Sequence, residues 1–149
     1  MVEKIPLSRL PTPRGLAESL YLSGEDFVAL LESGPGFPDR ARYTILAWGI
    51  ERELASYGRY DELKTFYKSL QAGGGPFGGE LAVGFVSYDL VPEIEPTLSG
   101  YVKSDGEFPR ALFVAPNNVV IYDNLLGRAY VKGRIPAPPQ KNRDLKLGG

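Results

Sequence analysis

The sequence predicts an α+β domain with a mainly antiparallel sheet and two helices. Five or six short runs are rich in β-branched and aromatic residues, as strands are. Two further segments carry helical signals, one of them with apolar residues at helical spacing. A chain of 149 residues fits one domain with a buried core. We expect that domain in residues 1–133, followed by a proline-rich polar tail or linker in residues 134–149.

The first helix is predicted for residues 13–21. Thr12 suits the N-cap, and Pro13 suits the first helical position, where the missing N–H of proline is no loss. Leu16 and Leu20 then lie on one face of this helix.

The next part of the chain holds one ambiguous segment and two predicted strands. Residues 23–33 combine a helix-capping pattern with a short apolar run that also fits a buried strand, and both alternatives stay open. Residues 42–48 are rich in β-branched and aromatic residues, which predicts a strand. Residues 51–57 are predicted to pair with that strand across a turn at Gly49.

The second helix is predicted for residues 61–71, and a run of glycines ends it. Its apolar positions at i, i+3, i+4 and i+7 are Leu63, Phe66, Tyr67 and Leu70. A strand over residues 81–88 follows, with Tyr88 expected in the core. Because Gly84 interrupts its apolar run, we expect a bulge or a close backbone approach there.

Three more strands are predicted at residues 111–115, 119–123 and 128–132. Turn residues separate them at 116–118 and 124–127. We therefore expect a meander, in which each of these strands pairs with the next.

Composition and charge exclude several classes of function. The 17 basic and 18 acidic residues are interspersed and leave a formal net charge of −1, so we expect no nucleic-acid or membrane partner. Cysteine and histidine are absent, which excludes disulfides and removes the commonest general base and metal ligand. Neither a membrane-length apolar run nor a signal peptide is recognisable, so we expect a cytoplasmic protein. The scarcity of Asn and Gln favours a thermophile source.

Four segments, in order, resemble the amino-terminal region of anthranilate synthase component I, a chorismate-binding enzyme family. Residues 30–34 read LLESG and are similar to the family's LLES segment. Residues 41–48 resemble the strand that follows it, and residues 79–90 resemble the family's GGLxGYxSYD segment. Residues 108–123 resemble the stretch that closes the region.

The resemblance implies a part in tryptophan biosynthesis, where the family's enzyme, a lyase, converts chorismate to anthranilate. That reaction uses Mg²⁺ and ammonia from a glutamine amidotransferase subunit. The chorismate pocket, the metal ligands and a catalytic histidine lie in a carboxy-terminal catalytic domain, so the resemblance assigns no catalytic residue, metal or cofactor to this chain. It implies instead a regulatory domain that contributes to an allosteric site for feedback inhibition by L-tryptophan.

The resemblance places the tryptophan-binding motif on four consecutive residues, Leu31, Glu32, Ser33 and Gly34. Glu32 would face the ammonium of the ligand, and the Ser33 hydroxyl with nearby backbone N–H groups would take its carboxylate. Leu31, Tyr43 and Ile45 would form an apolar wall against the indole. Without the resemblance, Glu32 and Ser33 fit a solvated strand end that enters a Gly/Pro loop.

Other interpretations follow from the same residues. We expect Arg42 and Asp89 to be solvated strand ends rather than members of a structural ion pair. A stand-alone interaction module that forms a homodimer is an alternative to a regulatory domain. The equivalent domain of aminodeoxychorismate synthase component I is another, because the difference between the two enzymes lies in the catalytic domain.

Overall fold

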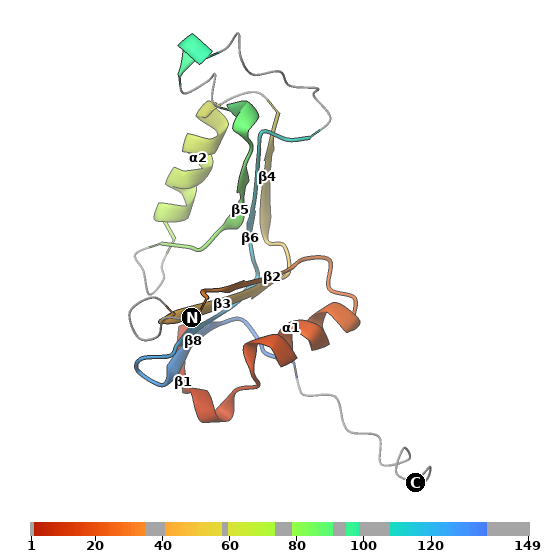
Figure 1. Cartoon of the computed structure of the whole chain (residues 1–149), viewed down its shortest axis with the longest axis vertical. Helices are drawn as coiled ribbons and strands as arrows, with labels where there is room; N and C mark the ends of the chain where they lie inside the picture. The colour runs from red at the N-terminus through yellow and green to blue at the C-terminus, as the bar shows by residue number, and fades with distance from the viewer. Residues whose placement is uncertain are drawn as a thin grey trace.

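The computed structural model (Figure 1) describes residues 2–34, 41–57, 60–73, 79–90, 95–98 and 108–136. Its strands form two antiparallel sheets, one of five strands and one of three, and an α-helix packs against each sheet. The predicted α+β class with two helices is confirmed. Most of the predicted tail, from residue 137 onward, lies outside the described residues.

The five-stranded sheet has the order β1 (Val2–Pro6), β8 (Arg128–Lys132), β7 (Asn118–Asp123), β3 (Tyr43–Trp48) and β2 (Val28–Glu32). Four of these strands cover predicted or ambiguous segments, and β2 resolves the ambiguity of residues 23–33 in favour of a strand. No local pattern predicts β1, because two charged residues and a proline interrupt its apolar positions. Pairing with β8 at the edge of the sheet makes it a strand.

The helix α1 (Pro13–Leu22) covers one face of this sheet and confirms the first predicted helix. The Gly15 amide donates to the Thr12 side chain at 3.2 Å, which satisfies one of the free N–H groups at the start of the helix. Leu16 and Leu20 are buried against six residues of the sheet: Leu46, Trp48, Val120, Tyr122, Ala129 and Val131. We call this group the α1-side core.

Tyr122 is the polar member of the α1-side core. Its hydroxyl donates to the Pro11 carbonyl oxygen at 3.2 Å. Burial disfavours the phenolate and raises the pKa of Tyr122 to about 12. The hydrogen bond ties the segment before α1 to the centre of the sheet.

The three-stranded sheet has the order β4 (Arg52–Ser56), β6 (Ala111–Ala115) and β5 (Val83–Val86). The helix α2 (Tyr60–Gln71) lies on one face, where Arg52 donates to Ser69 at 3.0 Å and its guanidinium stands over the Phe66 ring. The predicted second helix is therefore confirmed. Leu63, Phe66 and Leu70 are half-buried, whereas Tyr67 is exposed.

The opposite face of the three-stranded sheet is buried at one end, where Val83 packs against the other sheet and Val114 is 5% exposed, and it is more open at the other end. Ala55, Leu112 and Phe85 lie side by side across β4, β6 and β5, and 45% of Phe85 is accessible to solvent. These three residues form what we call the open face. Tyr88, in the short 3₁₀ helix Tyr88–Leu90 after β5, is 72% exposed, so its predicted place in the core is wrong.

Gly84 marks a close contact between neighbouring strands of this sheet. A Cβ at this position would collide with the main-chain oxygen of Leu112 on β6. The close backbone approach predicted at Gly84 is therefore confirmed, and only glycine fits without a shift of the strands.

Two predicted strand pairings are wrong. β4 pairs with β6 rather than with β3, and β6 pairs with β4 and β5 rather than with β7. Only the last step of the predicted meander, the β7–β8 hairpin, exists. Two other 3₁₀ helices, Leu7–Arg9 and Pro96–Leu98, were not predicted.

These pairings differ from the predicted ones because the chain forms one long two-stranded ribbon that bends from one sheet into the other (Figure 1). One strand of the ribbon is β3 followed by β4, and the other is β6 followed by β7. Trp48 pairs with Asn118 before the bend, and Arg52 pairs with Ala115 after it. Three residues on one strand therefore oppose two on the other, as in a β-bulge. Gly49 adopts a positive φ of 76° at this corner.

A second cluster lies where the two sheets meet. Ala47, Val119 and Ile121 of the five-stranded sheet are buried there, with Val83 of β5 packed against them. Tyr43, Ile45, Leu81 and Tyr130 surround this inter-sheet cluster. Neither of the described α-helices is long and apolar enough to cross a membrane.

Candidate functional site

The predicted tryptophan-binding residues lie at the carboxyl end of β2, an edge strand of the five-stranded sheet. Leu31 pairs with Ile45, and Glu32 pairs with Thr44. Because neighbouring residues of a strand point to opposite faces, Leu31 and Glu32 lie on different faces of the sheet. The structure therefore divides the predicted residues into an apolar and a polar group.

The apolar group is on the face that meets the three-stranded sheet. Tyr43 and Ile45 are half-buried against the inter-sheet cluster. Leu31 lies beside Ile45 at the edge, with 47% of its surface exposed. These three residues form a continuous apolar surface that is open to solvent at the β2 edge.

The polar group lines a shallow hollow on the α1 side. It has a volume of about 410 Å³ and is lined by Glu32, Ser33, Ala41, Thr44 and Asn124. The Asn124 amide group donates to the Ala41 carbonyl oxygen at 3.3 Å and to the Thr44 hydroxyl at 3.4 Å. Ser33 and the neighbouring Gly34 are exposed, and a Cβ at Gly34 would meet open space.

Glu32 already has a cationic partner. Its Oε2 accepts a hydrogen bond from Arg14 Nε of α1 at 3.1 Å, and the Arg14 side chain is 82% exposed. An exposed ion pair of this kind contributes about 0–1 kcal/mol. A ligand ammonium can therefore replace Arg14 at little cost in free energy.

Beside the hollow, Arg42 and Asp123 form an ion pair with two hydrogen bonds, of 3.2 Å and 3.0 Å. The expectation that Arg42 is merely a solvated strand end is wrong, and the Asp89 side chain lies outside the described part of the chain. Asp123 also accepts from the Leu125 and Leu126 amides. The hydrogen bonds from Arg42 contribute most to lowering the pKa of Asp123, and those from the two amides add to the effect. This network fixes the β7–β8 turn next to Asn124.

The site lacks the groups of a catalytic centre among the described residues. The chain contains no histidine that could act as a general base beside Ser33. Within the described ranges, no three His, Cys, Asp or Glu side chains gather to hold a metal ion. One carboxylate, two hydroxyls and an amide group are suited to the recognition of a small polar ligand.

Three residues that line the hollow were not predicted from the sequence, Ala41, Thr44 and Asn124, and neither was Arg14, the partner of Glu32. A local signal existed only for Asn124, because Asp-Asn after an apolar strand is typical of a turn held by side-chain hydrogen bonds. Arg14 reaches Glu32 only through the packing of α1 on β2, which no local pattern encodes.

No family model matches the chain. Anthranilate synthase component 1 from Aeropyrum pernix is 37% identical over 145 residues, which cover 93% of this chain and 32% of that protein. Anthranilate synthase component 1 from Saccharolobus solfataricus is 32% identical over 135 residues, which cover 87% of this chain and 31% of that protein. The chain is a domain of the anthranilate synthase component 1 family.

The chain spans about a third of the length of these anthranilate synthase relatives, which is consistent with the amino-terminal domain that its motifs indicate. The alignment with the Aeropyrum pernix protein covers 93% of the chain, so the few unaligned residues at the ends do not reach β2 or β3. The strands that carry the candidate site are therefore part of the homologous region.

Proposed function

We propose that this chain is the amino-terminal regulatory and structural domain of an anthranilate synthase component I, and that it contributes part of a tryptophan feedback site. The homology to two proteins of that name carries the proposal. The catalytic conversion of chorismate, with Mg²⁺ and a glutamine amidotransferase subunit, belongs to other parts of the enzyme. The absence of histidine from the chain supports this division of labour.

In this proposal, tryptophan binds at the end of β2. The indole lies against the apolar surface of Leu31, Tyr43 and Ile45, and the Ser33 hydroxyl and neighbouring amides receive the carboxylate. Ser33 is the best-placed polar residue, because it is exposed just after the end of β2 and borders the polar hollow close to Leu31. Glu32 binds the ammonium of tryptophan only after its ion pair with Arg14 breaks.

The open apolar surface at the β2 edge supports a site that is completed by a second domain. A ligand pocket normally encloses most of its ligand, whereas Leu31 is half exposed and the polar hollow is shallow. The chorismate-binding catalytic domain supplies the missing wall. Tryptophan bound between the two domains then favours one arrangement, with a coupling of about 1–3 kcal/mol.

Calorimetry and reconstitution test this proposal. Tryptophan titrated into the chain alone is expected to bind weakly or not at all, with a Kd above about 1 mM. Mixed with the catalytic domain of a relative, the chain is expected to make anthranilate formation sensitive to tryptophan. Micromolar affinity for the chain alone would contradict the shared site.

A pair of variants locates the effector in the reconstituted enzyme. Ser33→Leu is expected to raise the tryptophan concentration for half-inhibition about tenfold or more, because it removes a hydroxyl and fills the approach to the β2 edge. Thr65→Leu, which replaces an exposed hydroxyl on α2, is the control and is expected to change nothing. Equal inhibition of both variants would place the effector elsewhere.

A stand-alone interaction module is a second candidate. The apolar row of the open face favours it, because Ala55 and Phe85 are exposed on either side of the half-buried Leu112. A sheet face of this kind is usually covered by another surface. Sedimentation of the chain alone distinguishes the two functions: a defined homodimer supports the module, whereas a monomer that binds the catalytic domain supports the enzyme domain. Formation of aminodeoxychorismate rather than anthranilate after reconstitution would assign the chain to the related synthase.

A further inference from the structure

A single helix cannot cover the whole face of the five-stranded sheet. An α-helix with its side chains is about 10–12 Å wide, roughly two strand spacings of 4.8 Å. α1 lies over β2 and β3. The same face over β1 is left to the short segment 7–11 and to residues 135–136.

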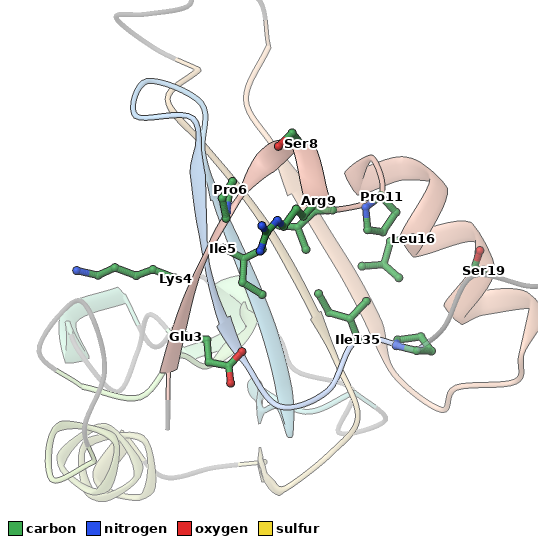
Figure 2. Close-up of a pocket in the computed structure, with 12 residues that line it drawn as sticks. Glu3, Lys4, Ile5, Pro6, Ser8, Arg9, Pro11, Leu16, Ser19 and Ile135 are labelled. Atoms are coloured by element: carbon green, nitrogen blue, oxygen red, sulfur yellow. The ribbon is translucent and has the colours of Figure 1, made fainter.

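A cavity of about 920 Å³ occupies this place, between β1, α1 and the chain after β8 (Figure 2). Its apolar lining includes Ile5, Leu10, Leu16 and Ile135, all of which belong to the α1-side core or pack against it. The floor of the cavity is therefore continuous with the fixed core of the domain. Its volume lies in the range of small-molecule sites.

Arg9 gives the cavity an available cation. Arg14, Arg42 and Arg52 each form an ion pair with a carboxylate. The Arg9 side chain forms no hydrogen bond or ion pair with another described residue, and Figure 2 shows it extending toward Ile5. A guanidinium above an apolar surface binds a carboxylate through two parallel hydrogen bonds.

The two other charged lining residues restrict the ligand. Lys4 points to the opposite face of the sheet, where its ammonium lies 5.9 Å from the Tyr130 ring centre. Glu3 is on the same side as Ile5, about 6–7 Å further along β1. The cavity therefore has a basic group near Ile5 and an acidic group further along the strand.

We propose that this cavity binds a small monocarboxylate with an apolar body. The Arg9 guanidinium holds the carboxylate, and Ile5, Leu16 and Ile135 contact the apolar body. Glu3 repels a second carboxylate at the far end of the ligand. This site is separate from the β2 edge and does not depend on the proposed tryptophan site.

Methyl NMR of the whole chain tests the proposal with three probes of equal chain length: octanoate, octanamide and suberate. Octanoate is expected to give saturable shifts of the Ile5, Leu16 and Ile135 methyl signals with a Kd of about 0.1–1 mM. The neutral amide and the dicarboxylate are each expected to bind at least about fivefold more weakly. Equal binding of octanoate and octanamide, or no saturable shift up to about 10 mM octanoate, would overturn it.

Substitution of the cation provides the matched comparison. Arg9→Met is expected to weaken octanoate binding about fivefold to tenfold while leaving octanamide unchanged, and Arg9→Lys to restore part of the loss. Arg134→Met removes a nearby exposed arginine that does not line the cavity, and it is expected to change the Kd less than about twofold. An equal loss in Arg134→Met, or no loss in Arg9→Met, would show that Arg9 does not hold the ligand.

Discussion

The two sheets of this domain differ in how completely they are covered. α1 buries Leu16 and Leu20 fully against the five-stranded sheet. α2 buries no residue fully against the three-stranded sheet, and the other side of that sheet carries the partly exposed open face, where 45% of Phe85 is accessible to solvent. We therefore expect the five-stranded sheet to contribute more to the free energy of unfolding than the three-stranded sheet, one side of which is partly exposed. Each of the variants below tests this division.

The largest effect is expected from Leu46→Ala. Leu46 is fully buried in the α1-side core, and truncation of such a leucine lowers the free energy of unfolding by about 2–5 kcal/mol. Leu31→Ala, on the half-exposed edge of the same sheet, is expected to cost less than about 1 kcal/mol. Urea denaturation measures the free energy of unfolding of both variants. Equal losses would contradict the expected difference between the covered core and the sheet edge.

Gly84→Ala is expected to destabilise the three-stranded sheet by about 1–3 kcal/mol, because its methyl group forces β5 away from Leu112 of β6. Hydrogen exchange is expected to accelerate at the amides of β5 and β6 before those of β7 and β8. Gly34→Ala, where a methyl group meets open space, is the control. Uniform acceleration in both sheets would show that they unfold as one unit.

Tyr122→Phe removes the hydrogen bond to Pro11 and is expected to cost about 0.5–1.5 kcal/mol at pH 7. A tyrosine in the unfolded chain ionises near pH 10, while the folded protein holds this proton to about pH 12. The stabilising contribution is therefore complete below pH 10 and is lost as the pH rises toward 12. The loss of stability over this interval is expected to be smaller in Tyr122→Phe, and denaturant midpoints from pH 7 to 12 measure it.

The smallest effect on stability, below about 0.5 kcal/mol, is expected from Phe85→Ser on the open face. Binding to the catalytic domain, or self-association, is expected to weaken in the same variant. Tyr21→Ser on α1, where 75% of Tyr21 is exposed, is expected to leave association unchanged. Sedimentation of both variants measures the difference, and unchanged association in Phe85→Ser would remove the open face from the interface.

Elements with strong local signals were predicted well. Thr12-Pro13 marks the start of α1, and apolar spacing identifies α2. Strand partners were not predictable, because β4 is adjacent to β3 in sequence yet pairs with β6, some sixty residues away. The corner at Gly49 allows this exchange of partner, and a positive φ is compatible with both a hairpin and a bend.

The LLES-like motif suggested candidate residues for the site, but neither their geometry nor the other residues of the hollow, Ala41, Thr44 and Asn124. The LLES-like segment identified Leu31 to Gly34, and the β-strand period then requires Leu31 and Glu32 to point apart once residues 28–32 form a strand. The opposite orientation of the two side chains could not be predicted while residues 23–33 also fitted a helix. The contact between Glu32 and Arg14 depends on the packing of α1, a long-range feature.

The bent ribbon has a topological consequence. Every strand of the five-stranded sheet lies outside residues 50–117, and the Asn117 amide donates to the Gly49 carbonyl oxygen at 3.4 Å. The three-stranded sheet is therefore an insertion into the five-stranded sheet, and the two ends of the inserted segment lie next to each other. Replacing it with a two-residue Asn-Gly turn between Trp48 and Asn118 would give a miniature protein, whose newly bared residues, above all Ile45, Ile121 and Val119, would need polar substitutes.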